Sequence, residues 1–267
     1  MGVINVTPDS FSDGGLLMGR APDLPCILDL AATMLADGAA VLDVGGESTR
    51  PGAAAVSEAE ECRRVMPVIE RLLELDTIVS VDTSKPGVAA RALAAGVQLI
   101  NDVTGGRDPG MLRLLAESDA ALCLMHMQGE PRTMQLAPSY TDVVAEVREF
   151  LAARVAACRQ AGIADQRLLL DPGFGFGKTL QHNLALLRNL EALRVDGLPM
   201  LVGLSRKAMI GALTGRPAGQ RAAGSAAAAL LAAQRGASLI RAHDVAETAD
   251  ALRMLAAMDG TIDQQGE

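Results

Sequence analysis

The chain contains eight short runs of apolar residues, and each run ends at or beside a polar residue. Most runs are four to eight residues long, which is too short for a typical helix but suits a strand buried on both faces. Segments with helical periodicity separate the runs. Strands that alternate with helices are typical of an α/β fold, and eight such units predict a single-domain (β/α)8 TIM barrel. The runs cover residues 2–5, 41–44, 78–82, 98–102, 122–127, 168–171, 200–207 and 239–243.

Capping signals and apolar faces mark several of the helices between these runs. Residues 57–60 read Ser-Glu-Ala-Glu, which is a capping box for the helix that follows. Apolar residues at helical spacing between Val143 and Val155 predict one buried helix face. Asp244 and Glu247 are expected to cap a last helix.

Length, charge and cysteine usage narrow the class of protein. A chain of 267 residues is close to the size of one β/α barrel of about 250 residues, and we expect the barrel domain at residues 1–258 and a frayed tail at 259–267. The formal net charge of −8 and the lack of a long basic stretch argue against nucleic-acid binding. No apolar run approaches the ~18 residues of a membrane span, and no signal-peptide pattern precedes the first strand. Four scattered cysteines without a C-x-x-C pair fit a reduced, cytoplasmic protein.

The few aromatic residues are placed unusually. The chain has no Trp, one Tyr and four Phe, and Phe11, Phe174 and Phe176 lie in glycine-rich loops beside strand ends. A buried core position is the ordinary reading for any one Phe. Three of them in loops predict a flat apolar wall for an aromatic ligand.

Three of the strands end in residues that suit one polar ligand edge. Asp82, Asn101 and Asp171 lie at or next to the ends of the third, fourth and sixth runs, and strand ends in this fold meet at the mouth of the barrel. A buried carboxylate needs hydrogen-bond donors, so a ligand with adjacent N–H groups, such as an amino-pyrimidinone ring, fits these acceptors. The alternative for each residue alone is a strand-end cap or an ion pair with a neighbouring lysine.

Cationic side chains gather at other strand ends. Arg50, Arg206, Lys207, Arg241 and His243 follow the second, seventh and eighth runs. The loops after strands seven and eight commonly bind phosphate in this fold, and Arg forks match phosphate oxygens. Solvated surface charge is the alternative for each of them, but together they predict a bound polyanion such as a diphosphate.

Other chemical signals are weaker. Asn5, near Asp9 and Asp13, offers oxygen ligands for a diphosphate-bound Mg²⁺, although no all-protein cage is visible. The glycines of residues 171–178 lack both Walker A and dinucleotide-binding spacing. His126 and His182 have no partner at metal-ligand spacing, so we interpret both as structural.

The motifs INVTPDSFSDGG, DVGGESTRPGA, SVDTSKP, LCLMHMQG, LLLDPGFGFGK, GLSRK and IRAHDV occur in this order along the chain. Together they resemble the dihydropteroate synthases, a family of pterin-binding enzymes, from Gly2 to about Leu255. The resemblance implies a cytoplasmic, homodimeric transferase of folate biosynthesis. Its expected reaction joins 6-hydroxymethyl-7,8-dihydropterin diphosphate to p-aminobenzoate, giving 7,8-dihydropteroate and diphosphate, with Mg²⁺ as cofactor and sulfonamides as competitors of p-aminobenzoate.

The resemblance also implies roles for the strand-end residues, which fall into four sets. The pterin set is Asp82, Asn101, Asp171 and Lys207. The diphosphate set is Asn5, Arg50, Arg241 and His243, with Asn5 also the ligand of Mg²⁺. The p-aminobenzoate set is Thr49, Arg50, Pro51, Phe176, Ser205 and Lys207. Phe11 and Asp13 belong to a mobile first loop that closes over the site.

The chain departs from the family pattern in two ways. Ala208 stands where the family often has a polar residue for the p-aminobenzoate carboxylate, so Arg50 or backbone amides would have to replace it. The chain opens almost directly on the first strand, which leaves the barrel floor less covered or marks a truncation.

A pterin-binding methyltransferase shares the Asp and Asn pattern, but its methyl donor has no diphosphate to explain residues 205–207 and 241–243. A non-catalytic pterin-binding module is the second alternative.

Overall fold

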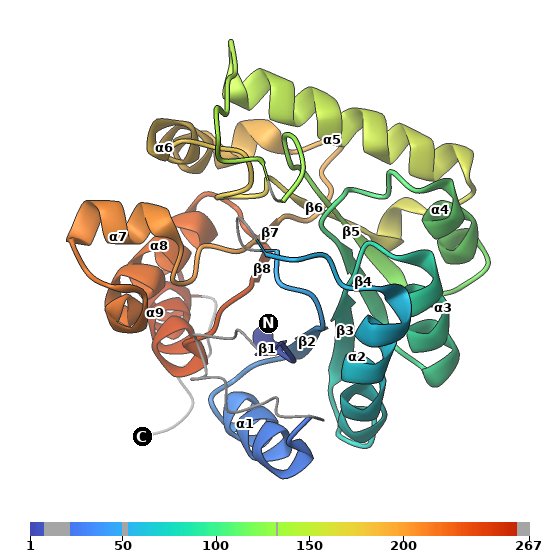
Figure 1. Cartoon of the computed structure of the whole chain (residues 1–267). Helices are drawn as coiled ribbons and strands as arrows, with labels where there is room; N and C mark the ends of the chain where they lie inside the picture. Colours follow the sequence, from blue (N-terminus) through green and yellow to red (C-terminus); the bar gives the residue numbers. More distant parts are fainter. Residues whose placement is uncertain (8–21, 50–52, 132, 261–267) are drawn as a thin grey trace.

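A barrel of parallel strands forms the centre of the computed structural model, which describes residues 1–7, 22–49, 53–131 and 133–260 (Figure 1). Each strand overlaps one of the eight predicted runs. The strands are β1 (Gly2–Asn5), β2 (Val41–Gly45), β3 (Ile78–Asp82), β4 (Leu99–Asp102), β5 (Ala121–Met125), β6 (Leu168–Asp171), β7 (Leu201–Val202) and β8 (Leu239–Ile240).

Two single bridges close the barrel. Strands β1 to β6 form one parallel sheet in chain order, and β7 pairs with β8. A parallel bridge between Leu170 and Met200 joins β6 to the start of β7, and one between Gly2 and Ala242 joins β1 to the end of β8. The predicted (β/α)8 barrel is confirmed, although β7 and β8 are far shorter than the apolar runs that contain them.

The helices surround the strands on the outside of the barrel (Figure 1). An apolar core joins both layers, because the buried side chains of strands and helices form one large cluster. The helices are α1 (Leu24–Ala36), α2 (Glu58–Leu72), α3 (Pro86–Ala95), α4 (Pro109–Ala116), α5 (Val143–Gln160), α6 (Leu180–Arg188), α7 (Ala208–Thr214), α8 (Ala222–Gln234) and α9 (Val245–Met258), and short 3-10 turns lie at Asp165–Arg167, Leu190–Leu193 and Ala218–Gln220.

The helix predictions are confirmed in part. Ser57 caps α2 by accepting from the Glu60 backbone N–H at 3.2 Å, but the Glu60 carboxylate binds Arg63 and Arg64. The predicted face of α5 is buried at its apolar positions. Asp244 occupies the N-cap position of α9 without a side-chain capping bond. The predicted helix start is confirmed, but the side chain of Asp244 does not cap α9 because its carboxylate binds an arginine of another loop.

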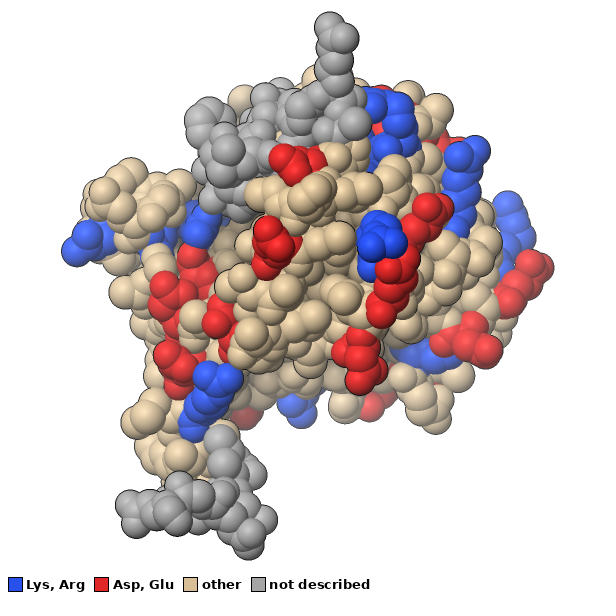
Figure 2. All heavy atoms as spheres, turned by 90° about the horizontal axis from the view of Figure 1, so that it is seen from below, with Lys and Arg blue, Asp and Glu red and all other residues tan. Residues whose placement is uncertain are grey.

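Burial contradicts one of the predictions drawn from the aromatic residues. Phe174 is fully buried in the core, so its predicted place in an exposed aromatic wall is wrong. All four cysteines are free. No helix within the described residues is long and apolar enough to cross a membrane. On the face of the molecule in Figure 2, the described acidic and basic side chains are interspersed.

Candidate active site at the carboxyl ends of the strands

Backbone pairing brings three predicted site residues to one level of the barrel. Asn5 pairs in register with Gly45, Gly45 with Asp82, and Asp82 with Asn101. A Cβ atom on Gly45 would lie 3.6 Å from Asn5 Oδ1 and 3.7 Å from Asp82 Cβ. Since Gly45 has no side chain, space remains between Asn5 and Asp82 at the mouth of the barrel.

Arg241 ties the loop after β8 to two carboxylates inside the barrel. Its Nε lies 2.7 Å from Asp43 Oδ2, and its Nη2 lies 3.0 Å from Asp82 Oδ2. Asp43 is fully buried and also accepts from Ser80 Oγ at 2.5 Å. No hydrogen bond joins Arg241 Nη1 to the described residues, so its N–H groups are among the donors available to an anionic ligand.

Asp43 is a site residue that the sequence-based prediction omitted. The signal was its position, because a carboxylate in the middle of the apolar strand Val41–Gly45 needs a buried partner. That partner, Arg241, is 198 positions away along the chain.

The side chain of Asn101 contains a buried acceptor without a hydrogen-bond partner among the described residues. Its side chain is buried, and its Nδ2 donates to Asp43 Oδ2 at 3.3 Å. Its Oδ1 is buried without a hydrogen-bond partner among the described residues. Leaving such an atom unpaired costs about 1–3 kcal/mol, and a ligand N–H would remove that cost.

Asp171 and Lys207 form the opposite part of the same site. Asp171 Oδ1 accepts from the Gly173 backbone N–H at 2.7 Å, and burial raises the Asp171 pKa, opposed chiefly by Lys207. Lys207 Nζ donates to the Phe174 carbonyl and lies 4.5 Å above the Phe176 ring centre. Burial lowers the pKa of Lys207 to about 8 and raises that of Asp82 to about 7, with Arg241 acting against the rise.

A buried lysine shapes the loop that carries Phe176. Lys178 Nζ donates to the carbonyls of Gly173 and Phe176, both at 2.9 Å, and lies 2.9 Å from His126 Nδ1. Burial, and next the charge of Lys178, lower the His126 pKa to about 3, so His126 is a neutral acceptor. Gly173 has φ +67°, and a Cβ there would lie 1.9 Å from the His126 carbonyl. The close approach of the His126 backbone therefore explains why residue 173 is a glycine, without a bound dinucleotide.

His126 and His182 both have structural contacts, as predicted. His182 forms a capping box with Thr179 at the start of α6. The role of Lys178 in holding this loop, by contrast, was missed in the sequence-based prediction.

A second charged cluster fixes the start of the loop after β2. Lys85 Nζ lies 2.5 Å from Glu47 Oε2 and also pairs with the buried Glu61 of α2. Glu47 Oε1 accepts from the Val56 backbone N–H at 2.8 Å, which joins the two ends of the loop. Thr49 is half-buried within this segment.

Four predicted site residues, Phe11, Asp13, Arg50 and Pro51, lie outside the described residues. Within the described part of the chain, no group of three or more His, Cys, Asp or Glu side chains could hold a metal ion.

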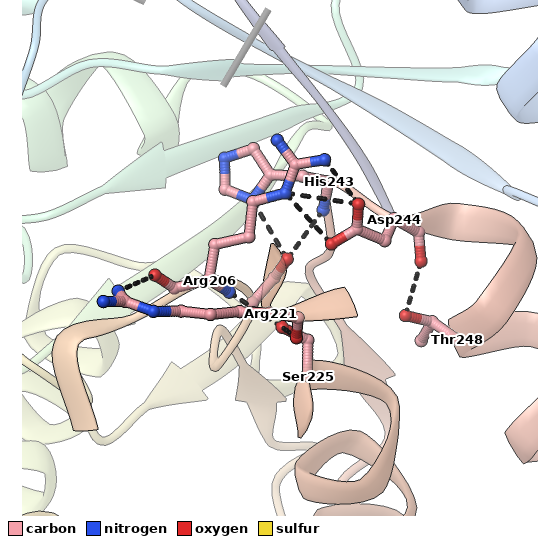
Figure 3. Close-up of polar contacts among 7 residues, drawn as sticks. Arg206, Arg221, Ser225, His243, Asp244 and Thr248 are labelled. Atoms are coloured by element: carbon pink, nitrogen blue, oxygen red, sulfur yellow. Dashed lines mark hydrogen bonds and ion pairs between the residues drawn. The ribbon is translucent and has the colours of Figure 1, made fainter. Parts of the chain in front are cut away.

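The loops after β7 and β8 contact each other directly (Figure 3). Ser205 Oγ lies 3.1 Å from His243 Nδ1, and Arg206 forms an ion pair with Asp244. Arg206 was predicted as one of the anion-binding cations, but the structure directs its guanidinium to a carboxylate of the protein.

Comparisons with known proteins agree with this geometry. Residues 1–243 match the family model of pterin-binding enzymes. The Escherichia coli K12 dihydropteroate synthase is 50% identical over 258 residues, which is 96% of this chain and 90% of that protein. The chain belongs to the dihydropteroate synthase family.

Solved structures of the dihydropteroate synthase family superpose closely on this chain. The Yersinia pestis enzyme in complex with a sulfonamide drug has a TM-score of 0.93 at 49% identity, covering 97% of this chain and 94% of that one. The Burkholderia cenocepacia enzyme complexed with 7,8-dihydropteroate has a TM-score of 0.86 at 47% identity, covering 99% and 92%. The resemblance inferred from the sequence motifs is confirmed, and the methyltransferase alternative is set aside.

Proposed function

We propose that this chain condenses 6-hydroxymethyl-7,8-dihydropterin diphosphate with p-aminobenzoate, releasing 7,8-dihydropteroate and diphosphate. The observation that carries the proposal is a buried polar edge with an unpaired acceptor, Asn101 Oδ1, beside the cations Arg241 and Lys207. A pterin supplies the N–H donors for the edge, and a diphosphate supplies the negative charge for the cations.

The pterin is proposed to lie between strands β3, β4 and β6. Asp171 accepts from the adjacent N–H groups of its amino-pyrimidinone edge, and Asn101 Oδ1 accepts from another ring N–H. Lys207, whose pKa the Asp171 carboxylate raises against the effect of burial, donates to the pterin carbonyl and ring nitrogen. Each such charge-assisted hydrogen bond is worth about 1.5–3 kcal/mol.

The p-aminobenzoate is proposed to bind on the side of Phe176, with Thr49, Ser205 and Lys207. The Phe176 ring under Lys207 supports this placement, because it offers a flat apolar wall beside a cation. Arg50 and Pro51 are also proposed to bind p-aminobenzoate, on the basis of the family resemblance alone. Sulfonamides, one of which the Yersinia pestis relative binds, are proposed to compete here.

The reaction needs little proton transfer before the bond breaks. The methylene C–O bond breaks, diphosphate leaves, and the arylamine nitrogen attacks the same carbon and releases a proton. The arylamine is already neutral near pH 7, so no strong base is required. Arg241 and His243 stabilise the charge that develops on the diphosphate, and an ionised Asp82 lowers the energy of positive charge on the pterin methylene.

We propose Mg²⁺ as the cofactor, held by Asn5 together with the diphosphate oxygens. Two observations support this fit. The Asn5 Oδ1 atom faces the space left by Gly45, and Mg²⁺ at phosphate sites usually binds only one or two protein ligands. When bound, the ion neutralises diphosphate charge.

Release of diphosphate from the pterin substrate tests the proposed function. We expect release that depends on both p-aminobenzoate and Mg²⁺, with equal amounts of diphosphate and dihydropteroate, and with loss of activity in excess EDTA. Asn5→Ala should raise the Mg²⁺ concentration required by about tenfold or more, since it removes the only proposed protein ligand. No release with or without p-aminobenzoate would refute the synthase function, and unchanged release in EDTA would refute the cofactor.

We also propose a cytoplasmic homodimer. Exposed apolar residues on α7, α8 and α9, namely Leu213, Leu231, Met254 and Met258, lie on helices that share one flank of the barrel (Figure 1). Burying them against a second chain would remove apolar surface from water. Light scattering should give the mass of two chains, and Leu231→Glu should lower it towards one. The mass of a single chain for the unmodified protein would contradict the dimer.

A further inference from the structure

The loops after β7 and β8 are joined through two pairs of consecutive residues. Ser205 contacts His243, and the next residue on each loop, Arg206 and Asp244, forms the second contact. Arg206 Nε lies 3.0 Å from Asp244 Oδ2 and 3.2 Å from Asp244 Oδ1, and Nη2 also donates to Oδ1. The Asp244 side chain is only 10% exposed, so this pair is better shielded than a surface ion pair.

The backbone of Arg206 is held in an unusual conformation. Its φ is +57°, a left-handed value that costs a non-glycine residue about 1–3 kcal/mol. Its N–H donates to Ser225 Oγ at 3.0 Å, and its carbonyl accepts from Arg221 Nη1 at 3.0 Å. Figure 3 shows Arg206 reached by Arg221 and Ser225 from one side and by Asp244 from the other. The turn separates Ser205 from Lys207, two residues of the proposed site.

Ser205 makes two contacts with His243. Ser205 Oγ lies 3.1 Å from the His243 backbone nitrogen, which donates to it, and 3.1 Å from His243 Nδ1. The hydroxyl has one proton of its own to donate. When the hydroxyl donates that proton to Nδ1 of a neutral ring, the ring proton lies on Nε2.

We propose that Ser205, Arg206 and Asp244 are positioning residues that hold His243 with a proton on Nε2, ready to donate to the leaving diphosphate. Ser205 sets the tautomer, and the Arg206–Asp244 ion pair fixes the distance between the two loops. This inference rests on the proposed function of the site. It replaces the sequence-based expectation that Arg206 binds the anion itself.

A double-mutant cycle separates positioning from direct binding. The variants are Arg206→Gln, Asp244→Asn and both together, with Arg159→Gln as the control because Arg159 forms an exposed ion pair with Asp165. We expect each single change to weaken inorganic diphosphate binding about tenfold, since small misplacements at a site have large effects, and the double variant to be no weaker. Binding of free 6-hydroxymethylpterin should stay unchanged. Additive losses, or a loss in Arg206→Gln alone, would show that Arg206 binds the anion directly and would overturn the proposal.

Nitrogen-15 NMR of the three histidines provides a readout that does not depend on activity. We expect the His243 ring to carry its proton on Nε2 in the unmodified protein, and Ser205→Ala to produce a mixture of tautomers with folding intact. A ring protonated on Nδ1, or a spectrum unchanged by Ser205→Ala, would overturn the tautomer assignment. Absence of diphosphate release by the unmodified enzyme would overturn the proposed function and leave this result untouched.

Discussion

Replacing Asp171 by asparagine is expected to lower kcat/KM by at least ~100-fold and to abolish measurable pterin binding. The carboxylate would accept two adjacent pterin N–H groups, and two charge-assisted hydrogen bonds are worth about 3–6 kcal/mol together. Asparagine keeps one acceptor and introduces an NH₂ group that opposes the pterin donors. Calorimetric titration with 6-hydroxymethylpterin and steady-state kinetics measure the two effects.

The asparagine variant should remain folded, which separates lost binding from lost structure. Asp171 Oδ1 accepts from the Gly173 backbone, and an asparagine oxygen can take over that contact. Asp142→Asn is the matched control, because Asp142 caps α5 on the outside of the barrel and asparagine caps helices equally well. Pterin binding within threefold of the unmodified protein in Asp171→Asn would refute the assigned pterin edge.

Replacing Arg241 by methionine is expected to lower the free energy of unfolding by about 3–5 kcal/mol, because it leaves a buried carboxylate without its charged partner. Asp43 is fully buried and depends on Arg241 Nε at 2.7 Å, and Asp82 loses its contact with Nη2. Urea unfolding followed by circular dichroism measures the change.

A second substitution should restore most of this stability. In Asp43→Asn/Arg241→Met, the buried charge is absent and Ser80 and Asn101 remain as hydrogen-bond partners of residue 43. We expect the double variant to be more stable than Arg241→Met alone, yet still defective in diphosphate binding. A double variant less stable than either single one would contradict the assigned ion pair.

The sequence predicted the positions of the strand ends well because strand burial is a local signal. Apolar runs that end at Asp82, Asn101 and Asp171 mark both the strand and the place where its side chain meets the barrel mouth. The structure adds that Asn5 and Asp82 lie at one level on either side of Gly45, through the register of β1, β2 and β3.

Pairings across the chain were beyond the sequence patterns. Nothing local to Arg241 indicates that Asp43 and Asp82 share its guanidinium, and nothing local to Asp244 indicates that its carboxylate binds Arg206 and leaves α9 without a side-chain cap. The prediction for Phe174 was wrong for a related reason. Its glycine-rich loop suggested exposure, whereas Lys178 binds the loop backbone from inside and the Phe174 ring is buried.

Titration of two variants with two ligands tests whether one set of strand ends binds the pterin and another binds the diphosphate. Asp171→Asn and Asp43→Asn/Arg241→Met would each be titrated with 6-hydroxymethylpterin and with its diphosphate. We expect Asp171→Asn to lose both ligands. The Arg241 variant should lose tenfold or more of its affinity for the diphosphate ligand and keep most of its affinity for free hydroxymethylpterin. Equal losses of both ligands in both variants would contradict this assignment.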